Sequence, residues 1–223
     1  MKNIETNGLP TSWSWTTLDN IIIALESGNR PKGGVRGIDK GIPSLGGEHL
    51  EYGGSFKFDR IKYVPPTFYE QMSKGKIRIN DILVVKDGAT TGKAAHISNS
   101  FPFKDAAVNE HIFILRIDKE LMSSKYLFYW IQSLMGQECI RQNISGSAQG
   151  GINSHFVKNS NLPLAPTNEQ HRIVAKIEEL FTKLDAGVEA LKQAQEQLKR
   201  YRQSVLKAAV EGRLTEEWRE QHL

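Results

Sequence analysis

Apolar residues recur every seven positions along residues 167–212, and this pattern predicts one long helix. With Ile177 at heptad position a, the pattern stays in phase for five heptads. The a positions are Ile177, Leu184, Leu191, Leu198 and Val205, and the d positions are Leu180, Gly187, Ala194, Tyr201 and Ala208. A helix of about 44 residues is roughly 66 Å long, more than a small domain can bury. The pattern favours pairing with a second helix along this apolar seam; an amphipathic helix packed on its own domain is the alternative.

Both ends of this helix are marked in the sequence. Pro163 and Pro166 precede it, and Thr167 with Gln170 forms the T-x-x-Q pattern of a capping box. In such a box each of the two residues satisfies a free backbone N–H of the other. Gly212 lies where a left-handed C-cap residue is expected.

The small d residues indicate how two such helices would pair. A parallel pair in register would stack Gly187 on Gly187 and Ala194 on Ala194, which leaves costly voids. An antiparallel pair centred near residues 192–193 places Leu191 against Ala194 and Leu198 against Gly187. We therefore expect an antiparallel homodimer through this helix, because isologous pairing would hide the seam.

The first part of the chain has shorter patterns. Apolar runs predict strands within residues 79–88, 93–98 and 110–117. Residues 11–25 suit a short strand followed by a helical turn or a second strand. We expect an α+β fold with a mixed α/β domain and a mainly antiparallel sheet, followed by the long helix. The expected divisions are residues 1–165 (the head), 166–212 (the arm) and 213–223 (a short extension).

Helical spacing continues through residues 123–143, with Leu127, Ile131, Leu134 and Met135 along one face. Aromatic residues crowd the start of this predicted helix. They are Tyr126, Phe128, Tyr129 and Trp130. Such side chains can stack on extruded bases, but a cluster of this kind is more often part of a core.

Composition narrows the class of protein. Cys139 is the single cysteine, which excludes a disulfide framework or a cysteine metal cluster, and the histidines show no metal-binding spacing, so no metal site is expected. The N-terminus lacks the apolar region of a signal peptide, and no apolar run is long enough for a membrane span. We expect a cytoplasmic protein without membrane contact.

The positive charge is concentrated in the head. Residues 167–223 carry ten Lys and Arg against ten Asp and Glu, so the net charge of +4 belongs to residues 1–166. Cationic residues gather in three segments of the head: Arg30, Lys32, Arg36 and Lys40; Lys57, Arg60 and Lys62; and Lys74, Lys76 and Arg78. Glycine-rich loops with long cationic side chains suit phosphate contact, although each residue alone could equally be a solvated surface residue.

Catalytic motifs are not found. The segment Gly88–Lys93, GATTGK, has three residues between its glycines where a phosphate-binding Walker loop has four. Ala94 stands where that loop needs a hydroxyl for magnesium. We therefore expect a non-catalytic protein.

Several segments resemble the specificity subunits of Type I restriction–modification systems. They are LPTSWSWTTL (9–18), DILVVKDGATTGKAAHIS (81–98), KYLFYWIQS (125–133), GSAQGGIN (146–153), PLAPTNEQHRIVAKIEEL (163–180) and LKAAVEGRLTEEWR (206–219). The last two are the most specific, whereas residues 27–60 fall where such subunits differ from one another. The resemblance implies that the head is a target recognition domain for double-stranded DNA and that the helix is the conserved arm. Family members usually carry two of each in one chain, so this sequence corresponds to a short subunit that dimerises or to half of a longer one.

The resemblance also implies partners and cofactors. Methyltransferase subunits carrying S-adenosylmethionine would dock on the arms, and an ATP-driven restriction or motor subunit would join the complex; this chain itself would bind no cofactor. Each head would read one half of a bipartite target. Our candidates for DNA contact are Arg30, Lys32, Arg36, Lys57, Lys86, Thr90, Thr91 and Lys93, with Ser147 and Gln149 as weaker ones.

Two other functions stay open at this point. A dimeric DNA-binding regulator with a coiled-coil arm would bind DNA tightly without a methyltransferase subunit. A coiled-coil adaptor that binds no nucleic acid would show a flat salt dependence in DNA-binding assays.

Overall fold

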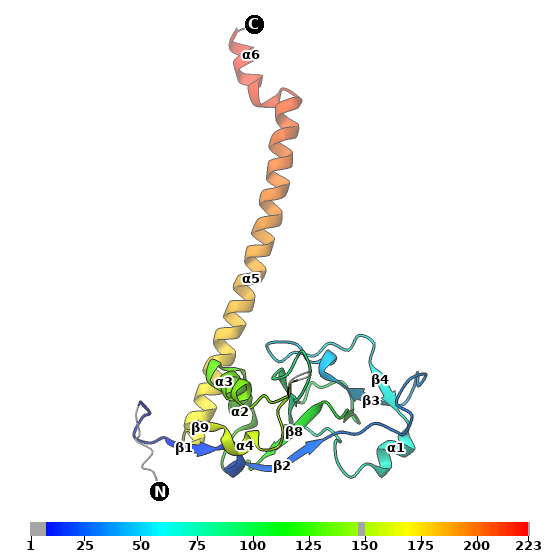
Figure 1. Ribbon diagram of the computed structural model, residues 1–223. Coiled ribbons are helices and arrows are strands. Elements are labelled where there is room, and N and C mark those ends of the chain that lie inside the picture. Colours follow the sequence, from blue (N-terminus) through cyan, green and yellow to red (C-terminus); the bar gives the residue numbers. More distant parts are fainter. Residues whose placement is uncertain (1–7, 147–149, 223) are drawn as a thin grey trace. The chain divides into compact units, whose positions relative to one another are not determined.

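The computed structural model describes residues 8–146 and 150–222. The chain forms two compact units, Met1–Val174 and Ala175–Leu223. Every strand that the structure describes lies in the first unit, and a long helix continues through the second (Figure 1). The predicted α+β fold with antiparallel sheets and a long C-terminal helix is confirmed.

A four-stranded antiparallel sheet lies at the centre of the first unit, in the order β2-β8-β5-β6. Its strands are β2 (Ile22–Ser27), β8 (Ile112–Ile117), β5 (Ile82–Val85) and β6 (Ala94–His96). Strand β5 is buried on both faces: Ile82 and Val84 enter one hydrophobic core, and Leu83 and Val85 enter a second one. A strand covered on both faces is apolar throughout, which accounts for the continuous run in the sequence.

Two smaller sheets complete the β-structure. Strand β3 (Ile42–Leu45) pairs antiparallel with β4 (Lys62–Val64) and parallel with β7 (Ala107–Val108). Strand β1 (Ser14–Thr17) pairs antiparallel with β9 (Asn161–Leu164) and so joins the two ends of the head. Short 3-10 turns follow β1 (η1, Leu18–Asn20) and β3 (η2, Gly47–His49). For residues 11–25 the sequence predicted a short strand followed by a helical turn or a second strand, and the structure has both, since the turn η1 leads from β1 into β2.

The helices of the first unit before the arm are short. They are α1 (Pro66–Gln71), α2 (Ser124–Gln132), α3 (Leu134–Gln142) and α4 (Phe156–Asn159). Tyr126, Phe128 and Trp130 are buried and Tyr129 packs against the same core, as the core interpretation of this cluster predicted.

The prediction of a single helix over residues 123–143 is wrong, because the chain breaks at Ser133. Ser133 has extended backbone angles, and its hydroxyl accepts a hydrogen bond from the Gly136 N–H at 3.2 Å. A Cβ at Gly136 would lie 2.2 Å from the Trp130 carbonyl oxygen, so α3 can pack this closely only with glycine there. The break also turns Leu134 and Met135 outward, with exposed fractions of 87% and 47%.

Helix α5 (Thr167–Val210) begins and ends where the sequence predicts. Gly212 has the expected left-handed conformation, with φ of 74°. It is followed by the turn η3 (Arg213–Thr215) and the short helix α6 (Glu216–His222). Arg219 Nη2 donates a hydrogen bond of 2.7 Å to the Gly212 carbonyl oxygen and so holds this turn closed.

The predicted capping box at the start of α5 is wrong in its hydrogen bonds. Gln170 is fully buried, and its Oε1 accepts from the Ser123 backbone N–H at 2.8 Å. Its Nε2 donates to the carbonyl oxygens of Leu121 and Ala165 at 3.0 and 2.8 Å. The side-chain amide of Gln170 is therefore bonded to these backbone groups and does not cap the backbone N–H of Thr167.

No helix within residues 8–146 and 150–222 is both long and apolar enough to cross a membrane.

Candidate nucleic-acid interface

The segment between β5 and β6, residues 86–93 (the 86–93 loop), is held by neighbours on several sides. The Gly92 N–H donates to the Val85 carbonyl oxygen at 2.9 Å, and Thr91 Oγ1 donates to the Gly88 carbonyl oxygen at 2.7 Å. Gln137 of α3 donates from Nε2 to the Gly92 carbonyl oxygen at 3.0 Å. A glycine-rich loop fixed in this way can present side chains without a further ordering cost.

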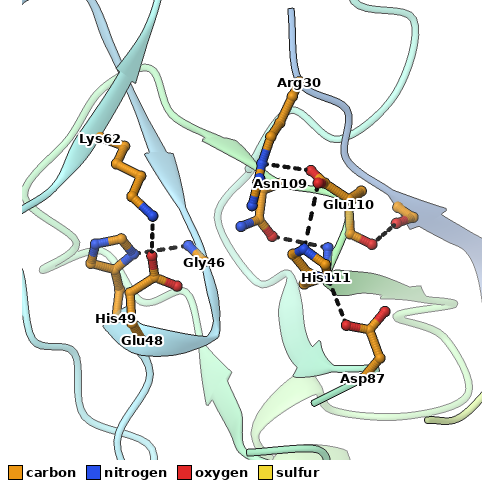
Figure 2. Close-up of polar contacts among 10 residues, drawn as sticks. Arg30, Gly46, Glu48, His49, Lys62, Asp87, Asn109, Glu110 and His111 are labelled. Carbon is orange, nitrogen blue, oxygen red and sulfur yellow. Dashed lines mark hydrogen bonds and ion pairs between the residues drawn. The ribbon is translucent and has the colours of Figure 1, made fainter. Parts of the chain in front are cut away.

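A cluster of charged side chains lies at one end of this loop (Figure 2). His111 Nδ1 lies 2.5 Å from Asp87 Oδ1, and His111 Nε2 lies 3.4 Å from Glu110 Oε1. The other oxygen of Glu110 lies 2.9 Å from Arg30 Nε. The side chain of Asn109 orients this turn, because its Oδ1 accepts from the His111 backbone N–H at 3.0 Å. These side chains are part-exposed, except the buried Asn109, so they form an ordered polar surface.

The register of the central sheet explains why these residues meet. Val85 of β5 pairs with Ile112 of β8, and the ladder continues outward because the Lys86 N–H donates to the His111 carbonyl oxygen at 2.9 Å. Asp87 follows Lys86 directly, and its Oδ1 lies 2.5 Å from Nδ1 of the His111 ring at the same end of the strand pair.

The turn η2 lies against the middle of the 86–93 loop. A Cβ at Gly47 would lie 3.1 Å from Thr90 Oγ1, and one at Gly46 would lie 2.7 Å from Asn109 Nδ2. The Gly46 N–H donates to Nδ1 of the buried His49 at 2.8 Å, and burial lowers the pKa of His49. A neutral imidazole with Nδ1 as acceptor therefore fixes this turn.

Glu48 in the same turn is paired with a cation. Lys62 Nζ donates to Glu48 Oε1 at 2.8 Å (Figure 2). Burial alone would raise the pKa of Glu48, but the hydrogen bond from Lys62 and the nearby charges bring the pKa below its ordinary value. Both residues line an open hollow of about 480 Å³ together with Glu51, Lys57, Asp59 and Arg60.

The structure brings together half of the residues predicted to contact DNA. Lys86, Thr90, Thr91 and Lys93 lie on the 86–93 loop, and Arg30 joins them through Glu110. The Lys86 ammonium lies 5.3 Å from the centre of the Phe113 ring, and that of Lys93 lies 4.7 Å from the centre of the Tyr52 ring. These contacts hold the cations on the surface.

The other predicted residues lie apart from this loop or are not described. Lys57 lies 3.4 Å from Asp59 in the open hollow. Lys32 and Arg36 are exposed in the segment between β2 and β3. Ser147 and Gln149 lie outside the described residues.

Sequence reasoning missed the carboxylates, the aromatic rings and the amide of this surface. They are Glu48, Tyr52, Asp87, Asn109, Glu110 and His111. The candidates were chosen for positive charge in glycine-rich segments, and that criterion does not select the carboxylates that hold these cations in place. Asp87 and His111 are neighbours because β5 pairs with β8, and the sequence carried no separate signal for this contact.

Comparisons with known proteins give a consistent result. Residues 47–200 match the family model described as "Type I restriction modification DNA specificity domain". The chain is 27% identical over 221 residues to the EcoBI specificity subunit of the Type I restriction enzyme of Escherichia coli, an alignment that covers 95% of this chain and 44% of that protein. It is 29% identical over 155 residues to the StySPI specificity subunit of Salmonella potsdam, covering 67% of this chain and 33% of that protein.

Solved structures show the same fold. The HsdS subunit from Thermoanaerobacter tengcongensis superposes with a TM-score of 0.64 at 19% identity, over 85% of this chain and 47% of that one. A chain from a study of complex assembly and conformational transition of the type I R-M system superposes with a TM-score of 0.66 at 21% identity, over 92% of this chain and 47% of that one. The present chain spans less than half the length of these relatives. The predicted resemblance is confirmed: since the family model matches most of its length, the chain belongs to the Type I restriction–modification DNA specificity domain family.

Proposed function

We propose that this chain recognises DNA for a Type I restriction–modification complex, and that its head reads one half of a bipartite target. The observation that carries the proposal is the 86–93 loop, which presents Lys86, Thr90 and Lys93 on a hydrogen-bonded framework. Family membership supports it, because the curated relatives are named as specificity subunits of Type I restriction enzymes.

The side chains of this surface contact different parts of the DNA. Lys86 and Lys93 contact phosphates and so set the register of the protein on the duplex. Arg30 exchanges its contact with Glu110 for one with DNA, and an arginine placed in the major groove can bind guanine with two hydrogen bonds. Thr90 and Thr91 lie on the same loop between these lysines.

The arm pairs with the arm of a second copy in antiparallel orientation. In the single chain its apolar seam is uncovered: Leu184, Leu191 and Leu198 are 62%, 72% and 68% exposed. Large uncovered leucines at heptad spacing favour a helix partner. An antiparallel pair centred near residues 192–193 places Leu198 against Gly187 and Leu191 against Ala194. A large side chain then fills the space beside a small one in these layers.

The paired arms fix the spacing of the two half-sites and dock methyltransferase subunits. S-adenosylmethionine belongs to those subunits, and ATP to a restriction or motor subunit. In this division of labour the present chain supplies recognition and performs no catalytic step.

A salt-dependent selection experiment tests the proposal. The chain, co-purified with a Type I methyltransferase subunit from the same organism, is offered a library of randomised duplexes. We expect enrichment of a split motif with a fixed spacer, and an affinity that falls steeply with salt concentration. Enrichment of no motif together with a flat salt dependence would contradict the proposal.

Variants that remove lysine charges test, in the same assay, whether the 86–93 loop contacts DNA. Lys86→Gln combined with Lys93→Gln should reduce the slope of log affinity against log salt by about 2, since each phosphate contact contributes about 0.9. The matched control is Lys192→Gln with Lys199→Gln, which removes the same charge from exposed arm positions outside the seam and should leave the slope unchanged.

A further inference from the structure

Tyr52 lies at the tip of a tight hairpin beside the 86–93 loop. Leu50 and Phe56 form an antiparallel bridge, and the Glu51 N–H donates to the Ser55 carbonyl oxygen at 3.0 Å. Gly53 and Gly54 have φ of 91° and 92°, a conformation that side-chain-bearing residues rarely adopt. The turn therefore has one defined backbone shape, with Tyr52 at its outer end.

The hairpin is pressed against α2 and cannot shift inward. A Cβ at Gly54 would lie 2.2 Å from Phe128 Cζ, and Phe128 is itself buried in the core. Gln132 of α2 donates from Nε2 to the carbonyl oxygen of Ala94, the residue after Lys93. The same helix thus braces both the hairpin and the end of the 86–93 loop.

The Tyr52 ring is exposed and yet held in place. Its exposed fraction is 73%, and the Lys93 ammonium lies 4.7 Å from the ring centre. A cation at this distance is attracted to the aromatic face, so it orients the ring and keeps a positive charge next to it. An exposed tyrosine alone would need no explanation. A braced tyrosine with a cation on it has the features of a nucleic-acid contact: an aromatic ring for bases and an ammonium for phosphate.

We propose that Tyr52 is a specificity-determining residue that contacts a base of the DNA half-site, while Lys93 binds the adjoining phosphate. This inference rests on the proposed function and extends it, since it assigns direct readout to a residue outside the cationic set. The ring packs against the base, and the hydroxyl is available to a polar group on the base edge.

Affinity measurements on the wild-type complex and on Tyr52→Ala, Tyr52→Phe and Lys93→Gln variants test this inference. Each complex is titrated with the selected duplex, with duplexes in which each base pair of the half-site is replaced singly, and with an unrelated duplex. Tyr52→Ala should weaken the selected duplex about 10-fold and abolish discrimination at one base pair, while the unrelated duplex and the salt slope stay unchanged. Tyr52→Phe should keep the affinity for the selected duplex that comes from packing of the ring on the base, and should lose only the contribution of the hydroxyl.

The lysine variant should behave differently from the tyrosine variant. Lys93→Gln should weaken all duplexes by a similar factor and lower the salt slope by about 1. Trp218→Ala, which removes an aromatic ring that is 61% exposed from α6, is the control and should match the wild type. Thermal unfolding of each variant checks the fold.

Two outcomes would overturn the assignment. If Tyr52→Ala binds every duplex as the wild type does, or weakens all of them equally, Tyr52 does not read sequence. If the wild-type complex itself prefers no duplex, the proposed function fails, and the assignment of Tyr52 fails with it.

Discussion

The Gln170 side chain accepts a hydrogen bond of 2.8 Å from the backbone N–H of Ser123, the residue that precedes α2. Through the same amide it donates to the carbonyl oxygens of Leu121 and Ala165. The first turn of α5 is therefore joined to the start of α2 by a single buried side chain.

Replacement of Gln170 should destabilise the protein markedly. Gln170→Leu keeps the approximate volume but leaves three backbone groups without this partner, and we expect a loss of about 3 kcal/mol in the free energy of unfolding. Denaturant unfolding measures the change. The exposed Gln142→Leu is the control and should change the free energy by less than about 0.5 kcal/mol. An equal effect of both substitutions would mean that the three hydrogen bonds contribute little.

Glu110 should restrain Arg30 when no specific DNA is bound. Glu110→Gln removes the carboxylate 2.9 Å from Arg30 Nε, so the guanidinium is free to contact phosphate. We expect affinity for unrelated duplex DNA to rise by about 5-fold and the salt slope to increase by up to about 1. Glu120→Gln makes the same change in net charge at another exposed site. If the two variants bind alike, Arg30 is no phosphate contact.

The apolar seam should determine the oligomeric state. Leu191→Glu combined with Leu198→Glu places four carboxylates in the core of a pair, and we expect monomers by light scattering. Gln193→Glu with Gln203→Glu adds the same charge at heptad positions c and f and should leave the dimer intact. A dimer that survives the leucine substitutions would show that the helices pair through another face.

The buried His49 should make stability depend on pH. Burial holds the pKa of His49 below the ordinary value of 6.5. Below pH 6.5 this imidazole is therefore protonated more readily in the unfolded chain than in the folded protein. Its contribution to stability is therefore fully present above pH 6.5 and is lost as the pH falls toward the lowered pKa. Between about pH 7.5 and 5.5 the wild type should lose more stability than His49→Asn, in which an amide oxygen can still accept from Gly46. Exposed His171→Asn should keep the wild-type dependence; a wild-type dependence in His49→Asn would contradict the prediction.

The strongest periodicities in the sequence predicted the fold best. The repeating apolar positions predicted the helix α5 correctly, and the apolar run predicted β5 correctly. The run of β5 reflects burial along the whole strand, whereas the pairing of α5 through its heptads stays a prediction. The break at Ser133 was missed, since it depends on how closely Gly136 approaches Trp130, which no periodicity records. Strands as short as β7 carry too few residues to show an alternation.

The cationic half of the candidate site could be predicted, and the rest could not. Lys86 and Lys93 stand out beside a glycine-rich loop, whereas Asp87 and His111 become neighbours only through the pairing of β5 with β8. Tyr52 carries no local signal either, because its position depends on the packing of Gly54 against Phe128.

Mapping of methylated bases across the genome of the source organism, with and without this gene, tests the central claim most directly. Both strains must express a Type I methyltransferase subunit. We predict that deletion removes methylation at one split motif, with inverted half-sites if the active form is a homodimer of this chain. Identical methylated motifs in the two strains would contradict a role in DNA recognition for this family member.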